Sequence, residues 1–231
     1  MDKTSLIAKI PLFSALSRQE VERLSEVVLL RSYSKGAAIV FEEDSATNAM
    51  FIIVTGKIRI SVMGYEGKEA ILAIMGPGEY FGEMSVIDGE PRSASAYAAE
   101  DTDLLVLRRE DLFHQLETNP RLALSMLIEF SKRLRQADTR ITSLALLGVY
   151  GRIANTLIEL ANSRGKREGD LVVITNRPTQ QEIADMTGTT RETVSRVLNR
   201  LQRSGSLIVE RDKIIILKLE GLHGEDNERL A

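Results

Sequence analysis

The sequence predicts an α+β protein with an N-terminal, jelly-roll-like β-roll, a long central helix and a C-terminal domain of short helices and a strand pair. Three observations predict it: short β-branched runs from about residue 36 to 108, a helical apolar pattern over 120–147, and two capped helices broken by one glycine after residue 178. The chain has 231 residues, more than one average domain needs. We divide it into residues 1–118, 119–147 and 148–231.

Composition removes several classes of protein. Apolar residues make up 43% and charged residues 27% of the chain, as in proteins that bury a core. The absence of cysteine excludes disulfides, cysteine-bound metals and thiol nucleophiles. The two histidines, His114 and His223, lie far apart and are expected at the surface, too few for a metal site or a Ser-His-Asp triad. We therefore predict no catalytic residues, no metal and no enzyme.

The sequence carries no signal for a membrane. No run approaches the ~18 uninterrupted apolar residues of a membrane span. The start, Met1 to Ser5, lacks the segments of a signal peptide. We expect a cytoplasmic protein without a membrane partner.

Charge is unevenly distributed along the chain. Residues 1–151 carry a net charge of −4, residues 152–219 carry +4 and residues 220–231 carry −3. The basic back half suggests that this part meets a polyanion. An ordinary solvated surface is the alternative, and charge alone does not decide between the two.

The front half is predicted as short strands. Gly and Pro separate β-branched runs at intervals of about ten residues, as in an antiparallel barrel or roll. The runs are Ala37 to Glu42, Met50 to Val54, Lys57 to Met63, Ala70 to Met75, Ser93 to Ala98 and Leu104 to Leu107. Before them, Ser17 and Glu20 have the spacing of a capping box that opens a helix reaching about Val28.

A long helix is predicted from Pro120 to Leu147. Its apolar residues recur at alternating steps of three and four, as at the a and d positions of a coiled coil. They are Leu127, Phe130, Leu134, Ala137, Ile141 and Leu144. A helix packed on its own domain also shows an apolar stripe, but this stripe is narrow, and we favour a parallel homodimer.

The back half begins after Gly148, with Gly151-Arg152-Ile153 opening a second domain. Helical spacing continues to about Leu160, and residues 163–167 are predicted as a loop. Two capping boxes follow. Thr179 with Glu182 opens a first helix that stops at Gly188, and Thr189 with Glu192 opens a second.

Two capped helices about ten residues apart, broken by one glycine, are the signature of a helix-turn-helix. On the second helix, the side opposite the apolar residues carries Arg191, Glu192, Ser195 and Arg196, the positions that enter a DNA major groove. Arg recognises guanine, and Glu can accept from cytosine.

After this helix, a hairpin is predicted from Leu207 to Leu217, with a basic tip that can contact a phosphate. The alternative for the whole region is a helical pair with a charged face. The two boxes, the Gly turn and the hairpin together favour DNA binding.

A Gly-rich segment stands out in the front half, from Gly78 to Ser85. Its glycines leave backbone amides accessible to a ligand, and Arg92 and Ser93 farther along the chain add a positive charge and a hydroxyl. Together these groups are suited to bind a phosphate. Glu83 would repel a phosphate, and a ribose hydroxyl is its natural partner. Two ordinary hairpin turns are the alternative.

These residues carry a resemblance. Phe81-Gly82-Glu83-Met84 followed by Arg92-Ser93-Ala94 resembles the phosphate-binding cassette of cyclic-nucleotide-binding domains. The whole layout, including Gly151-Arg152-Ile153-Ala154 and the run from Arg191 to Arg196, resembles the catabolite activator protein (cAMP receptor)/FNR family of bacterial transcription regulators. The fold that this implies is a β-roll, a dimerisation helix and a winged helix-turn-helix.

The resemblance implies two sets of site residues. Glu83 is expected to hold the ribose 2′-hydroxyl, and Arg92, Ser93 and nearby amides to hold the cyclic phosphate. The expected ligand-binding set is Gly82, Glu83, Met84, Ser85, Arg92, Ser93, Ala94, Arg133 and Asp138. The expected DNA-binding set is Gln180, Gln181, Thr190, Arg191, Glu192, Thr193, Ser195, Arg196 and Lys213.

The residues that would read the base depart from the family. The Thr and Ser that meet adenine in the cAMP receptor correspond to Ala137 and Asp138 in this chain. Asp138 can accept from the amino group of adenine or from two donors of guanine, and the second would favour cGMP or a guanine dinucleotide. A third reading makes Asp138 a solvated flank of the coiled coil.

The function implied is an allosteric homodimer that binds palindromic double-stranded DNA with GTGA-like half-sites. Ser195 leaves a TTGA-like preference open. The effector would be a cyclic nucleotide, cAMP or cGMP, with no tightly bound cofactor, and RNA polymerase would be a partner near residues 163–170. The alternative is a regulator of the same fold that responds to cyclic di-GMP, to another ligand or to none. A nucleotide-regulated subunit without DNA function has no use for Arg191 to Arg196.

Overall fold

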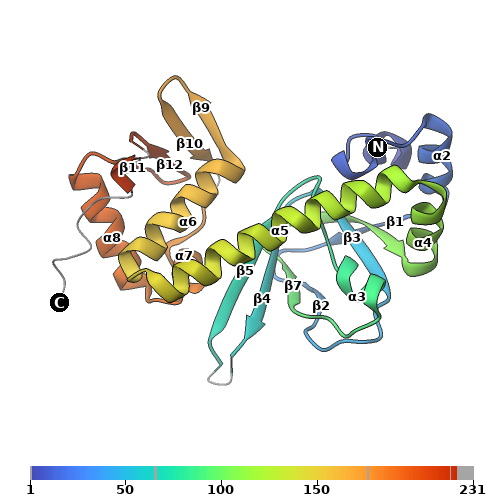
Figure 1. Ribbon diagram of the computed structural model, residues 1–231, viewed down its shortest axis with the longest axis horizontal. Helices are drawn as coiled ribbons and strands as arrows, with labels where there is room; N and C mark the ends of the chain where they lie inside the picture. Colours follow the sequence, from blue (N-terminus) through green and yellow to red (C-terminus); the bar gives the residue numbers. More distant parts are fainter. Residues whose placement is uncertain (1, 65–66, 176, 219, 223–231) are drawn as a thin grey trace. The chain divides into compact units, whose positions relative to one another are not determined.

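The computed structural model describes residues 2–64, 67–175, 177–218 and 220–222, without the side chains of residues 164 and 220. The chain packs into two units that divide between Arg133 and Leu134. The long helix α5 (Pro120–Leu146) therefore begins in the first unit and ends in the second (Figure 1). The finer division into residues 1–118, 119–147 and 148–231 stays a prediction.

The first unit is a roll of two four-stranded antiparallel sheets (Figure 1). One sheet has the strand order β1-β8-β3-β6 and the other has the order β2-β7-β4-β5. The strands are β1 (Leu29–Tyr33), β2 (Ala38–Val40), β3 (Ala49–Thr55), β4 (Ile58–Met63), β5 (Glu69–Met75), β6 (Tyr80–Phe81), β7 (Ser95–Ala98) and β8 (Thr102–Arg108). Phe51 of β3 pairs with Val106 of β8 on one side and with Phe81 of β6 on the other, so β6 is the edge strand next to β3.

Alternation along β3 builds two apolar clusters, because successive side chains point to opposite faces of a strand. Phe51 and Ile53 belong to one cluster, in which Phe51 stacks on Phe81 with 5.1 Å between the ring centroids. Met50 and Ile52 belong to the other cluster, which includes residues from the helices.

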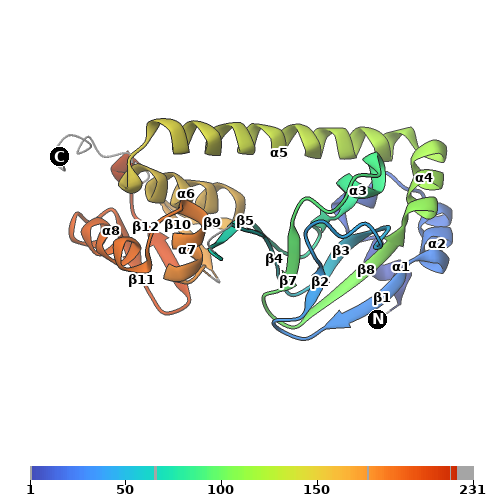
Figure 2. The same cartoon turned by 90° about the horizontal axis from the view of Figure 1, so that it is seen from below.

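Helices pack against this second face. They are α1 (Lys3–Ile7), α2 (Arg18–Val27), α4 (Arg109–Thr118) and the first turns of α5. Helices α2 and α4 lie at the same end of the roll in both views (Figures 1 and 2). Leu24, Leu112 and Leu122 are buried in the shared core. Ser17 and Glu20 form the predicted capping box at the start of α2.

The described part of the second unit contains three further α-helices, a short 3-10 helix (Glu220–Leu222) and one sheet. The α-helices are α6 (Val149–Arg164), α7 (Gln180–Thr187) and α8 (Arg191–Arg203). The antiparallel sheet has the order β11-β12-β10-β9 and consists of β9 (Gly165–Glu168), β10 (Leu171–Thr175), β11 (Leu207–Val209) and β12 (Lys213–Ile216). Leu157, Ile183 and Leu198 bring the three helices into one core with Ile174 and Ile214 of the sheet.

The predicted fold class is confirmed: a β-roll, a long helix and a winged helix-turn-helix follow one another along the chain. Each of the six predicted runs overlaps one observed strand. The prediction missed α1, β1, β6, α3 (Glu83–Asp88), α4, β9 and β10. In β1 four of the five residues are exposed, which leaves no apolar alternation to detect, and β6 has only two residues.

Two predictions about the back half are wrong in their boundaries. The predicted loop over residues 163–167 does not exist as such, because α6 continues to Arg164 and β9 starts at Gly165. This charged strand forms because it pairs with Leu171 to Ile174 of β10, and such cross-strand pairing outweighs intrinsic propensity. Helix α6 also begins at Val149, before the Gly151-Arg152-Ile153 run and the apolar spacing that indicated it.

The second predicted capping box is also wrong. Thr190, not Thr189, is the N-cap of α8, and its hydroxyl accepts from the backbone amide of Thr193 at 3.3 Å. Glu192 therefore lies one position too early to close a capping box. The box of Thr179 and Glu182 at the start of α7 is present as predicted.

We predict that Thr190→Ala destabilises the protein by about 1 kcal/mol, because a helix start loses its side-chain cap. The change is measured by urea denaturation of the full chain, followed by circular dichroism. Thr189→Ala is the matched control, and we expect it to leave the free energy of unfolding within about 0.5 kcal/mol of the wild type. A larger loss for Thr189→Ala than for Thr190→Ala would contradict the assignment.

Candidate functional site

The segment between β6 and β7 carries most of the residues predicted to bind a ligand. After β6, Gly82 adopts a left-handed conformation with φ of 77°, and the short helix α3 then runs to Asp88. Gly89 ends α3, again left-handed with φ of 80°. Arg109, at the start of α4, donates to the carbonyl oxygen of Val86 and so attaches α3 to the rest of the unit.

Arg92 is buried, and its guanidinium donates to backbone carbonyls. Nη1 donates to Gly82 at 2.5 Å, and Nη2 donates to Thr47 at 2.5 Å and to Ala49 at 2.7 Å. Nε has no hydrogen-bond partner among the described residues. Burial lowers the pKa of Arg92, and the nearby carboxylates of Asp44 and Glu83 oppose this shift. The side chain thus joins the start of α3 to the chain around the start of β3.

Glu83 is 2% exposed and is paired with an arginine from the long helix. Its Oε1 accepts from Arg133 Nη1 at 2.8 Å, and Arg133 Nη2 donates to the carbonyl of Tyr80 at 2.7 Å. The guanidinium also lies 4.7 Å from the centroid of the Tyr80 ring. These contacts join α5 directly to β6 and α3 within the first unit.

The second carboxylate oxygen of Glu83 does not share the contacts of the first. Oε2 is buried, and it has no hydrogen-bond partner in the described part of the chain. Burial raises the pKa of Glu83, while the charge of Arg133 opposes the rise. A buried acceptor of this kind is suited to a hydroxyl donor from a ligand, since an unpaired buried polar group is unfavourable.

Of the predicted ligand set, the structure brings Gly82, Glu83, Arg92 and Arg133 together through these contacts. Met84 is exposed, and Ser85 donates to the carbonyl of Gly82 at 3.4 Å. Ser93 is exposed and Ala94 half-buried, directly after Arg92 in the chain.

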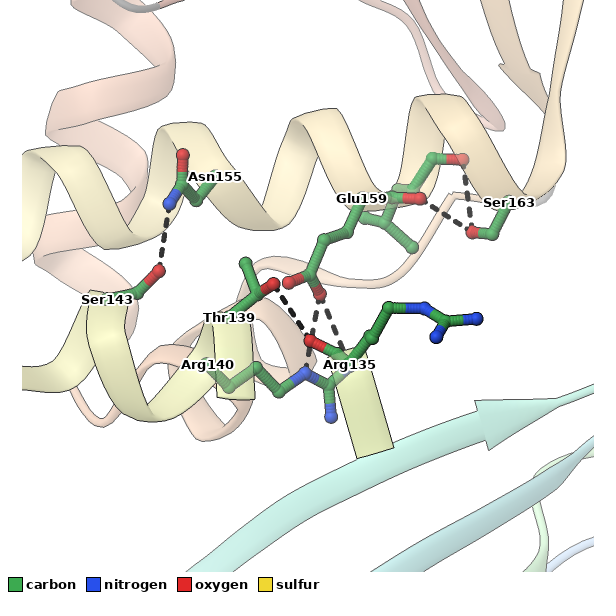
Figure 3. Close-up of polar contacts among 8 residues, drawn as sticks. Arg135, Thr139, Arg140, Ser143, Asn155, Glu159 and Ser163 are labelled. Atoms are coloured by element: carbon green, nitrogen blue, oxygen red, sulfur yellow. Dashed lines mark hydrogen bonds and ion pairs between the residues drawn. The ribbon is translucent and has the colours of Figure 1, made fainter. Parts of the chain in front are cut away.

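Asp138 lies on the part of α5 that belongs to the second unit. There it lines a pocket of about 500 Å³ between α5 and α6, together with Thr142, Leu146, Tyr150 and Asn155. Two polar contacts join the same helices (Figure 3): Arg140 Nη2 lies 3.3 Å from Glu159 Oε2, and Asn155 Nδ2 donates to Ser143 Oγ at 2.8 Å. They fix α6 against the end of α5.

Sequence reasoning missed the loop that receives Arg92. Asp44 accepts from the Thr47 hydroxyl at 2.6 Å and from the Ala46 amide at 2.8 Å, and these hydrogen bonds, the first above all, lower the pKa of Asp44. The loop in turn presents the Thr47 carbonyl to Arg92. The Asp-Ser-Ala-Thr run is typical of a turn in which the Asp side chain accepts from the backbone. The sequence gives no sign, however, that this turn contacts Arg92.

The second candidate site is the exposed start of α8. Its inner side is buried at Val194, Val197, Leu198 and Leu201. Arg191, Glu192 and Arg196 are exposed on the other side, and Ser195 is half-buried. Hydrogen bonds from its own backbone amide and from Thr190 lower the pKa of Glu192. Helix α8 therefore presents two cations and an ionised carboxylate at its first turns.

Other predicted DNA-binding residues lie around this helix start. Thr190 and Thr193 form the cap, and the Thr193 hydroxyl also accepts from Arg196 Nη2 at 3.0 Å. On α7, Gln180 is half-buried, and Gln181 is exposed and donates to Asp185 at 2.8 Å. Gly188 closes α7 in a left-handed conformation.

The predicted hairpin is present as β11 and β12, with Lys213 at its tip. Lys213 Nζ lies 3.4 Å from Glu210 Oε2, and Arg211 is exposed. Arg177, which sequence reasoning did not single out, donates from Nε to the carbonyl of Glu210 at 2.9 Å. An isolated Arg in front of Pro178 gives no sign in the sequence that it contacts residues 33 positions later.

The described residues contain no group of three or more His, Cys, Asp or Glu side chains that could hold a metal. No helix among them is long and apolar enough to cross a lipid bilayer. His114 is exposed, as expected, and His223 lies outside the described residues.

Comparisons with known proteins match both halves of the chain. A family model for the cyclic nucleotide-binding domain matches residues 30–119, and a model for the Crp-like helix-turn-helix domain matches residues 151–224. The cyclic AMP receptor protein of Thermus thermophilus is 37% identical over 195 residues, which cover 84% of this chain and 87% of that protein.

Solved structures agree. A variant of CooA from Carboxydothermus hydrogenoformans is similar over 92% of this chain and 93% of that one, with a TM-score of 0.79 and 26% identity. The c-di-GMP responsive global regulator CLP of Xanthomonas campestris is similar over 85% and 97% of the two chains, with a TM-score of 0.68 and 25% identity.

The chain belongs to the CRP/FNR family of transcription regulators. It combines a cyclic nucleotide-binding domain with a DNA-binding helix-turn-helix domain, and its family consists of regulators rather than enzymes. The resemblance on which the sequence analysis relied is confirmed.

We predict that Gly82→Ala destabilises the protein more than Gly89→Ala. Both glycines are left-handed, so each alanine meets a backbone penalty of about 1–2 kcal/mol. A Cβ on Gly82 would lie 2.5 Å from Arg92 Nη1, whereas a Cβ on Gly89 meets no atom within 4 Å. Gly82→Ala should therefore lose roughly a further 2 kcal/mol, because Arg92 must give up a buried hydrogen bond.

Urea denaturation of the two variants measures this difference. Because Gly89→Ala carries the same backbone penalty without the contact, it isolates the role of Arg92. Equal losses of stability would show that Arg92 moves aside freely and that its contact with Gly82 contributes little.

Proposed function

We propose that this regulator is a homodimer whose binding to palindromic DNA is controlled by a cyclic nucleotide in the β-roll. The observation that carries the proposal is Glu83, whose Oε1 is paired with Arg133 while Oε2 is buried without a partner among the described residues. A ribose 2′-hydroxyl would donate to Oε2, and Arg133 would keep its place on Oε1.

The cyclic phosphate would be held by Arg92, Ser93 and backbone amides. Arg92 Nε has no hydrogen-bond partner among the described residues, so it would donate to a phosphate oxygen while Nη1 and Nη2 keep the carbonyls of Gly82, Thr47 and Ala49. A guanidinium binds an anionic oxygen strongly, and this hydrogen bond would satisfy the unpaired donor.

The relatives favour cAMP as the effector. The Thermus thermophilus relative is a cyclic AMP receptor protein, and a relative from Mycobacterium tuberculosis, 29% identical over 226 residues, is a CRP-like cAMP-activated global transcriptional regulator. cGMP stays in the proposal because a carboxylate such as Asp138 suits the donors of guanine. Cyclic di-GMP is the alternative, since the Xanthomonas relative responds to it.

The homodimer is supported by α5. Leu127, Leu134, Ile141 and Leu144 are each at least 60% exposed, although their a and d spacing is that of a buried seam. A second copy of the same helix fits this stripe in parallel register. The coupling between sites then requires that the nucleotide bind the DNA-competent arrangement of the dimer more tightly than the other one.

The start of α8 would enter the major groove, with Arg191 and Arg196 on guanine and Glu192 on cytosine. Two such helices in a dimer would contact half-sites about 34 Å apart, one turn of DNA. The protein would act in the cytoplasm, and the β9–β10 hairpin, with exposed Lys166 and Arg167, would be the contact for RNA polymerase.

We predict that the protein binds cAMP roughly 10- to 100-fold more tightly than 2′-deoxy-cAMP, because a hydrogen bond to a charged acceptor contributes about 1.5–3 kcal/mol. In Glu83→Ala the two ligands should bind with nearly equal affinity. Isothermal titration calorimetry measures both preferences, with cGMP and cyclic di-GMP titrated in parallel.

Met84→Ala is the matched control next to Glu83, and it should keep the preference for the ribose even if the affinity for both ligands changes. If the wild-type protein binds the two ligands equally, Glu83 does not bind the ribose 2′-hydroxyl. Heat from cyclic di-GMP alone would favour the alternative effector. No heat from any nucleotide, from protein that binds DNA, would reject control by these ligands.

We predict that Arg191→Ala weakens binding to the cognate site by about 1–3 kcal/mol and relaxes the preference at one G·C pair in each half-site. The site is first obtained by selection from random duplexes, and a palindrome with half-sites one turn apart is expected. Arg203→Ala removes the same charge from the exposed last turn of α8 and should keep the sequence preference. An equal loss on all sequences for Arg191→Ala would instead indicate a phosphate contact.

A further inference from the structure

The tip of the β11–β12 hairpin, which we call the wing turn (residues 210–213), is held by a residue outside the hairpin. Within the turn, the amide of Glu210 donates to the carbonyl of Lys213 at 2.9 Å. Two further contacts come from Arg177, whose backbone amide donates to the carbonyl of Asp212 at 3.2 Å and whose Nε donates to the carbonyl of Glu210 at 2.9 Å. One residue thus binds both sides of the turn.

The rest of the hairpin is fixed by other means. Strand β12 pairs with β10, and this ladder ends where Lys213 lies opposite Thr175. On β11, the amide of Val209 donates to Gln202 Oε1 of α8 at 2.9 Å. Residues 210–212 lie beyond both pairings, and among the described residues Arg177 connects the turn to the start of the helix-turn-helix.

Arg177 also lies close to α7. It precedes Pro178 and the N-cap Thr179, and its Nη1 donates to the carbonyl of Pro178 at 3.3 Å. Arg177 therefore holds the wing turn, and Thr179, two residues later in the chain, caps the first helix of the helix-turn-helix. Arg suits this position because its planar guanidinium carries donors on several edges, whereas a lysine has one compact ammonium group.

We propose that Arg177 is a positioning residue for DNA binding: it holds the wing turn so that Arg211 and Lys213 reach the DNA phosphates. The inference rests on the proposed function, since it requires that the helix-turn-helix bind DNA. Arg211 is exposed, and Lys213 is half-buried with its ammonium near Glu210. Arg177 acts through these two cations and not as a phosphate contact of its own.

The test compares Arg177→Lys, Arg177→Ala and the double variant Arg211→Ala/Lys213→Ala on the duplex selected for the wild type. Binding is measured by fluorescence anisotropy at several salt concentrations. Arg177→Lys keeps the charge but loses the Nε donor, and we expect it to weaken binding about 3- to 10-fold. The slope of log K against log salt should fall by about 2 for a dimer that loses one phosphate contact in each half-site.

The decisive comparison is made in the Arg211→Ala/Lys213→Ala background. There, Arg177→Lys should cause no further loss, because the groups that Arg177 positions are gone. Arg203→Lys, an exposed and charge-preserving change on α8, is the control and should bind like the wild type. Thermal denaturation by circular dichroism tests that each variant is folded at the temperature of the assay.

Three results would overturn the inference. Wild-type affinity in Arg177→Lys with a loss in Arg177→Ala would make Arg177 a direct phosphate contact. Additive losses from Arg177→Lys and Arg211→Ala/Lys213→Ala would show that Arg177 acts independently of the wing. Unchanged binding by Arg211→Ala/Lys213→Ala would remove the wing from the DNA contact. A wild-type protein that selects no DNA sequence would instead reject the proposed function itself.

Discussion

A guanidinium withdrawn from solvent has to find its hydrogen bonds within the protein, and Arg92 finds them on backbone carbonyls from two distant parts of the chain. The carbonyls of Thr47 and Ala49 precede or begin β3, and that of Gly82 precedes α3. Without Arg92, three carbonyls would lose a charged donor in a region where water has little access. The conformation of the predicted ligand segment therefore depends on this side chain.

The ion pair of Glu83 and Arg133 extends the same arrangement to the long helix. A buried carboxylate is unfavourable unless a charge and hydrogen bonds compensate it, and Arg133 supplies the charge and one hydrogen bond. Because Arg133 lies on α5, the helix that carries the exposed apolar stripe also carries a residue of the candidate site. A change at Glu83 thus acts directly on α5, with no intervening side chain.

The sequence was sufficient to predict the long helix, six of the roll strands and the two helices around Gly188, because each carries a local signal. The resemblance to a family singled out Glu83 and Arg92, through a motif, and Arg133, through a matching position, as residues of the candidate site. The sequence did not predict that Arg92 donates to Thr47 and Ala49, or that Arg177 contacts Glu210, because such contacts join residues 33 or more positions apart. Strand β9 was missed for a similar reason, since its charged residues are held by pairing with β10.

The β9–β10 hairpin is a site where the fold can accept inserted residues. It turns at Gly169, where a Cβ meets no atom within 4 Å, and residues 166–170 are exposed. No side chain of this turn contributes to the core around Leu157 and Ile183. Extra residues inserted at Gly169 would lengthen an exposed ribbon and leave that core intact. The turn is therefore a place where the fold accepts a fluorescent label or an added peptide, although the proposed contact with RNA polymerase would then be obstructed.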